Sequence, residues 1–156
     1  MSNSTSSTKL MIPALGGLYE SLAPLAYPLI RFSAGLILMP HGAQKLFGWF
    51  GGGGISGTAG FFSSLGLEPA VPLVLLVGLV EFVGGLAIAI GLWTRLAAAL
   101  AAIDLLATIY LVHFANGFFW NAGGYEFPLL WAIVMIAIVI RGGQKMSLDS
   151  VIGKEF

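Results

Sequence analysis

Four long apolar runs alternate along this chain with short segments rich in glycine, proline and polar residues. A helix that crosses a bilayer needs about 20 predominantly apolar residues, and each run reaches or approaches that length. Pro40 ends the first run, whereas Pro72 and Pro128 stand at the start of later runs, where proline suits the first helical turn. The pattern predicts an all-α integral membrane four-helix bundle, with spans at about 22–40, 71–93, 96–114 and 125–141.

Composition agrees with a membrane protein of one domain. The chain has 156 residues, of which 58% are hydrophobic and 9% charged, against roughly a quarter charged in soluble domains. A net charge of zero argues against nucleic acid as a partner, because phosphate binding needs clustered Lys and Arg. We expect a mobile N-terminal segment over 1–21, a transmembrane domain over 22–141 and a cytoplasmic tail over 142–156. The segment Thr58–Leu67 is expected to be either a short interfacial helix within the first outer loop or a loop folded onto the bundle.

The distribution of Lys and Arg predicts the orientation. Four spans place both termini on one side of the membrane, and cytoplasmic loops carry the Lys/Arg excess. Lys45 alone falls on the opposite side. Both termini are therefore expected to be cytoplasmic, on the side that carries Lys9, Arg95, Arg141, Lys145 and Lys154.

Arg31, Glu81 and Asp104 are charged residues in the middle of apolar runs. Counted from Pro40, Pro72 and His113, each lies nine residues from an outer helix end, a depth of about 13 Å. Ionisable groups at bilayer depth usually pair with one another or serve a function. We therefore predict a buried ion pair between Arg31 and the two acids, which fixes the helices. Glu81 and Asp104 are candidate proton carriers, and the structural and functional roles are compatible.

The outer ends of the predicted helices carry polar and aromatic residues that could converge on one mouth. A quinone head group needs hydrogen-bond donors for its carbonyl oxygens, a proton source and an apolar slot. The alternative is that these aromatic residues only anchor the helices at the interface. The candidate quinone mouth comprises His41, Lys45, Trp49, His113, Tyr125 and Glu126.

Several of these motifs together resemble the DoxX/DoxD-like family of four-helix membrane proteins. The resemblance implies a multi-pass protein of the bacterial or archaeal cytoplasmic (inner) membrane with redox associations. Relatives include the membrane subunit of thiosulfate:quinone oxidoreductase, and no cofactor-binding motif comes with the family. The similar segments are Arg31 with Gly35, His41-Gly-x-x-Lys45-Leu-Phe-Gly, Glu81-x-x-Gly84-Gly85, Gly91-x-x-Thr94-Arg95, His113-x-x-x-Gly117-Phe-Phe and Gly123-Gly124-x-Glu126.

The first functional hypothesis is a quinone-interacting subunit of an oxidoreductase, in contact with the lipid bilayer and with other subunits or further copies of itself. The second is a non-catalytic accessory or assembly subunit, favoured by the absence of cysteine, which excludes dithiol relays and thiolate-bound clusters. A small transporter or channel is a third, although four spans without an inverted repeat argue against it. Haem bound between His41 and His113 is a fourth, but lone histidines at an interface more often form hydrogen bonds. No metal site is expected, because zinc would need ligands beyond these histidines and Glu126.

Overall fold

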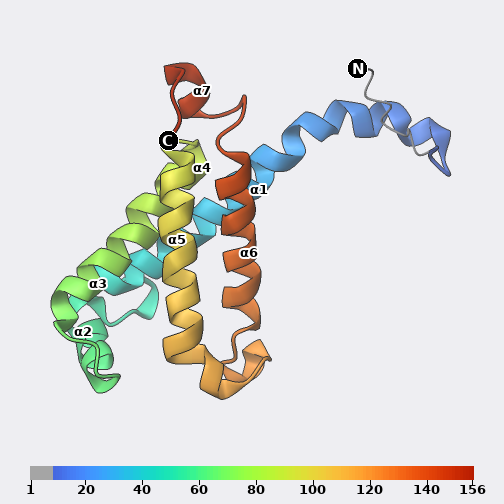
Figure 1. The fold of residues 1–156 in the computed structure, drawn as a ribbon. Coiled ribbons are helices and arrows are strands. Elements are labelled where there is room, and N and C mark those ends of the chain that lie inside the picture. Colours follow the sequence, from blue (N-terminus) through green and yellow to red (C-terminus); the bar gives the residue numbers. More distant parts are fainter. Residues whose placement is uncertain (1–8) are drawn as a thin grey trace.

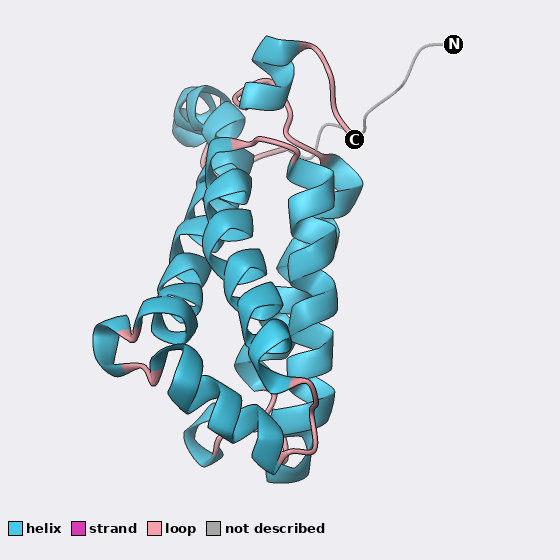
Figure 2. Cartoon of the chain, turned by 90° about the vertical axis from the view of Figure 1, so that its left-hand side faces the viewer, coloured by secondary structure: helices cyan, strands magenta, loops and turns pink. Residues whose placement is uncertain are grey.

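The computed structural model describes residues 9–156, and this part of the chain folds into helices and connecting turns without a strand. Figures 1 and 2 show long helices packed side by side, with short helical segments at both ends. Two π-helical turns, Val80–Gly84 and Ile109–His113, extend α3 and α5. The α-helices are α1 (Gly16–Phe47), α2 (Gly54–Ser64), α3 (Ala70–Leu79), α4 (Gly85–Ile90), α5 (Thr94–Thr108), α6 (Glu126–Arg141) and α7 (Leu148–Ile152).

Three helical rods in the described residues are long and apolar enough to cross a membrane: Pro13–Phe47, Ala70–Ile90 and Thr94–Asn116. The fourth predicted span corresponds to α6, whose 16 residues measure about 24 Å against a hydrocarbon core of about 30 Å. Helix α6 runs beside α5 along its whole length (Figure 1). The fold is therefore all-helical with three clear spanning candidates, and a crossing by α6 stays a prediction.

Helix α1 is longer at both ends than the sequence predicts. It begins at Gly16, so residues 16–21 are helical, whereas residues 1–8 of the predicted mobile segment lie outside the described residues. It also continues through Pro40 to Phe47 and ends at Gly48, whose φ of 72° is left-handed. Proline is tolerated inside membrane helices because neighbouring groups satisfy the freed backbone carbonyls. The prediction that Pro40 ends the first helix is therefore wrong.

Small residues bring the helices together. The buried core is rich in alanine, including Ala98 and Ala101, which are fully buried on α5. A Cβ on Gly35 would collide with the backbone of Gly85 and Ala89, so α1 and α4 touch backbone to backbone at this point. Close approach of this kind is typical of helix pairs in membranes. Large apolar side chains cover the outside of the bundle instead, as a lipid environment requires.

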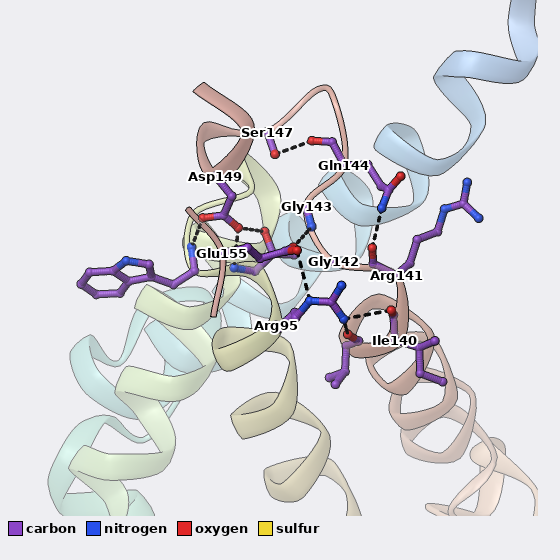
Figure 3. A network of polar contacts seen from close by, with 12 residues as sticks. Arg95, Ile140, Arg141, Gly142, Gly143, Gln144, Ser147, Asp149 and Glu155 are labelled. Carbon is purple, nitrogen blue, oxygen red and sulfur yellow. Dashed lines mark hydrogen bonds and ion pairs between the residues drawn. The ribbon is translucent and has the colours of Figure 1, made fainter. Parts of the chain in front are cut away.

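The C-terminal segment is folded against one end of the bundle (Figure 3). The buried carboxylate of Asp149 accepts hydrogen bonds from the Trp93 and Thr94 backbone N–H groups at 2.7 and 2.9 Å and from the Thr94 hydroxyl at 2.7 Å. Glu155 pairs with Arg95 at 3.1 Å. Helix α7 thus satisfies the exposed N–H groups at the start of α5, and the predicted tail is an ordered cap.

Candidate functional site

Arg31 does not pair with either buried acid. Its side chain is buried, and Nη1 donates to the carbonyl oxygens of Ile88 and Ala89 at 2.7 and 3.2 Å, while Nη2 donates to the Met146 carbonyl at 2.5 Å. The guanidinium therefore satisfies carbonyl groups at the C-terminal end of α4. The predicted ion pair is wrong because depth was counted from Pro40. Helix α1 continues to Phe47, which lies 16 residues beyond Arg31, or about 24 Å along the helix.

Lys45 is the cation that meets Glu81. The Lys45 ammonium donates to both carboxylate oxygens, at 2.8 and 2.6 Å. The Glu81 side chain is only 7% exposed and that of Lys45 24%. Glu81 also lies in the π-helical turn Val80–Gly84, a local distortion found frequently at functional sites. The bundle thus contains a largely buried ion pair that joins α1 to the second helical rod.

Two cavities lie on either side of this region. The first, of about 470 Å³, lies between α1, α5 and α6, and the Lys45–Glu81 pair forms part of its wall. The second, of about 350 Å³, lies between α2, α3 and α5. Lys45, Thr108 and His113 line both of them. The charged pair is therefore adjacent to space for ligands within an apolar bundle.

Trp131 lines the first cavity and has a hydrogen-bond donor without a partner in the described part of the chain. Its indole Nε1 is buried and has no hydrogen-bond partner among the described residues, and the side chain lines the cavity. A buried polar group without a partner is uncommon and needs an explanation. Sequence reasoning missed this residue, although an amphipathic tryptophan in the middle of the predicted span 125–141 was a usable signal.

Asp104 lines the second cavity and has a buried acceptor oxygen without a donor in the part of the chain that the structure describes. Its Oδ2 atom is buried and meets no donor within the described structure, and the residue lines that cavity together with Lys45 and Thr108. The two predicted proton carriers therefore differ in their surroundings. Glu81 is held by a cation, whereas Asp104 is not.

Only some residues of the predicted quinone mouth line the first cavity. His41, Lys45 and His113 line the first cavity. The His113 Nδ1 lies 2.6 Å from the Gly123 carbonyl oxygen, and because a carbonyl oxygen only accepts, Nδ1 is the donor. Trp49 lies outside the lining of both cavities, against Phe47.

Tyr125 and Glu126 also lie outside both cavities. The Tyr125 ring stacks on Phe114 with centroids 5.8 Å apart, and Glu126 accepts a hydrogen bond from the Trp120 backbone N–H at 3.1 Å. These two residues fold the connection between α5 and α6 on itself. Their predicted participation in a ligand mouth therefore has no support in this geometry.

Comparison with known proteins gives one family. The family model described as DoxX matches residues 26–114, which carry Lys45, Glu81, Asp104 and His113. A Bacillus subtilis (strain 168) protein named "Putative oxidoreductase CatD" is 31% identical over 81% of this chain and 86% of its own length. An uncharacterized Haemophilus influenzae protein is 26% identical over 84% of this chain and 93% of its own. No solved structure matches this chain.

Proposed function

Because this chain belongs to the DoxX family of membrane proteins, and a relative carries an oxidoreductase name, we propose that it is the quinone-interacting subunit of an oxidoreductase complex. The observation that carries the proposal is that Trp131, whose buried indole N–H has no partner among the described residues, lines the first cavity together with Lys45 and Glu81. A buried donor without a partner, on a residue that lines a cavity, favours a ligand with an acceptor oxygen.

The hydrogen-bond donors of the first cavity suit a quinone carbonyl. An ammonium has three N–H groups, and Lys45 uses two of them on Glu81. One N–H group of the Lys45 ammonium therefore remains for a ligand oxygen, in addition to the indole N–H of Trp131. A quinone offers only acceptors at its two oxygens, which matches this donor set.

The remaining walls of the first cavity suit an aromatic ring. Apart from His41, Thr108 and His113, they are apolar, with Leu38 and Leu105 from the core side and Phe127 and Pro128 from the start of α6. A volume of about 470 Å³ falls within the 300–1,000 Å³ typical of small-molecule sites. Apolar walls with a few convergent donors are the usual composition of such sites.

Reduction of a quinone to its hydroquinone consumes two electrons and two protons. In this proposal the electrons come from a partner protein that carries a redox group, and this chain supplies the ligand site. Glu81 and Asp104 are the candidate proton carriers, because both are carboxyl groups beside the cavities. Other subunits, or further copies of this chain, would cover part of the exposed apolar surface.

The membrane arrangement is part of the same proposal. We place four spans, including α6, in the bacterial or archaeal cytoplasmic membrane, with both termini in the cytoplasm. Arg95 and Arg141 lie near α7 (Figure 3), and Lys145 and Lys154 flank α7 in the sequence, which supports this orientation. Because the natural chain has no cysteine, single cysteines introduced at Lys154 and Gly51 would report the two sides by membrane-impermeant labelling.

The substitution Trp131→Phe tests the quinone site. It keeps an aromatic ring but removes the indole N–H, so the dissociation constant for a soluble quinone should rise about tenfold. Trp120→Phe is the matched control, because Trp120 is exposed and lies outside both cavities. Equal quinone affinity in the wild type and Trp131→Phe would remove the proposal.

A non-catalytic accessory or assembly subunit is the second candidate. The specific observation in its favour is that the chain contains no cysteine, so no thiol of its own can carry electrons. Under this alternative, deletion of the chain would reduce the amount of the assembled complex while the remaining complex kept its turnover. Under the quinone proposal, turnover per assembled complex would fall.

A further inference from the structure

The second cavity shares Lys45, Thr108 and His113 with the first and has in addition the carboxyl group of Asp104. This cavity lies between α2, α3 and α5. Most of its wall is apolar, with Phe61 and Phe62 from α2 and Val77 from α3. Asp104 from α5 is the carboxyl group in this wall. A ligand ring of the size proposed for the first cavity would therefore meet aromatic and aliphatic side chains here too.

The carboxyl oxygen of Asp104 that lacks a donor is the feature that the first cavity does not have. Lys45 lines the second cavity as well, but its ammonium is bonded to Glu81, and within the described residues it forms no bond to Asp104. A buried carboxylate oxygen is an acceptor, and it gains most from a ligand that donates an O–H or N–H group. Asp104 in the second cavity thus has an oxygen without a donor, whereas Trp131 in the first has an N–H without an acceptor, both among the described residues.

Quinones and hydroquinones differ in this property. The oxidised form offers two carbonyl oxygens, which only accept, and the reduced form offers two phenolic O–H groups, which can donate. We propose that the second cavity binds the hydroquinone form, with a phenolic O–H donating to the Asp104 carboxyl group, while the first cavity binds the oxidised form. This inference rests on the proposed function and adds a separate site for the reduced ligand.

The two cavities are lined in part by the same residues, which supports a pair of neighbouring sites. Lys45, Thr108 and His113 line both cavities, so a reduced ring leaving the first cavity would find the second directly beside it. Thr108 follows Asp104 by one helical turn on the same face of α5, and its hydroxyl can both donate and accept. The proposal concerns binding alone and requires no bond to form or break in the second cavity.

The test uses the full chain in lipid nanodiscs and two tail-less probes, duroquinone and its hydroquinone, kept reduced under anaerobic conditions. Asp104→Leu removes the acceptor and keeps the branched shape of the side chain. It should raise the dissociation constant for the hydroquinone about tenfold and leave that for duroquinone within about twofold. Asp104→Asn keeps an acceptor oxygen and should retain most of the hydroquinone affinity. Glu20→Gln, which alters an exposed acid on α1, is the control.

The outcomes separate the two proposals. Unchanged hydroquinone affinity in Asp104→Leu would overturn the second site while leaving the first intact, as would an equal loss of both ligands. Failure of the wild type to bind duroquinone would overturn the proposed function itself. Selective loss of hydroquinone in Asp104→Leu, with selective loss of duroquinone in Trp131→Phe, would support two sites of opposite hydrogen-bonding character.

Discussion

The Lys45–Glu81 ion pair provides a quantitative test of the buried site. Lys45→Met removes the cation and leaves Glu81, which is 7% exposed, with neither of its oxygens paired. Loss of one partner from a buried ion pair costs about 3–5 kcal/mol. Because the Lys45 side chain is 24% exposed, water screens part of this, and we expect a loss of about 2–4 kcal/mol in the free energy of unfolding.

A double-mutant cycle measures this loss and assigns it to the pair. The variants are Lys45→Met, Glu81→Gln and the double replacement, each unfolded reversibly in mixed micelles with a denaturing detergent. The double variant should be much closer to the wild type than the two single losses predict when added, because no unpaired charge is left in it. The expected coupling energy is about 1–3 kcal/mol.

Two results would refute this reasoning. The first is a Lys45→Met protein whose free energy of unfolding lies within about 0.5 kcal/mol of the wild type, the range of ordinary surface changes. The second is strict additivity of the two single losses, since groups that do not interact give additive effects. Either result would mean that the two side chains do not form the pair that the structure contains.

Three further predictions concern other polar groups. Asp104→Leu should raise the melting temperature, because it replaces an unpartnered buried carboxyl with an apolar group; a fall would show that Asp104 has a stabilising partner. Asp149→Ala should lower the free energy of unfolding by about 2–3 kcal/mol and expose the segment after Arg141 to protease, because three hydrogen bonds are lost; unchanged cleavage would contradict the ordered cap. Hydrogen bonds from the Ser63 side chain and the Ala70 N–H hold the pKa of Glu68 below its usual value, so its stabilising effect is present above the usual pKa and is lost as the pH falls through the lowered one. Glu68→Gln should flatten the melting temperature between about pH 5 and pH 3, and an unaltered profile would refute this role.

Much of the fold follows from the apolar pattern. The sequence predicts the second and third helical rods to within a few residues, the short helix within the first outer loop as one of two alternatives, and the family. The extent of α1 could not be predicted, because the effect of Pro40 depends on whether neighbouring groups compensate for the lost hydrogen bond. Because the first helix was expected to end at Pro40, Arg31 was expected to pair with the buried acids. For the same reason, the contact between Lys45 and Glu81 was not predicted.

The candidate site was harder to predict than the fold. Residue type and depth identified Arg31, Glu81 and Asp104 as unusual, and Lys45 was expected only in the outer mouth, so the pairing of Lys45 with Glu81 was not predicted. Trp131 was missed because an unpaired indole N–H is a property of the surrounding helices and not of the residue itself. Tyr125 was included because of its chemistry, although the turn that contains it directs its ring onto Phe114.

The indole N–H resonances of the four tryptophans report directly whether a quinone accepts a hydrogen bond from Trp131. Nitrogen-15-labelled protein in nanodiscs would be titrated with duroquinone, and Trp131→Phe would assign the relevant signal. We expect the Trp131 resonance to move downfield with saturable dependence on ligand, while those of Trp49, Trp93 and Trp120 stay in place. An unmoved Trp131 resonance at quinone concentrations that saturate binding would contradict the proposed quinone site.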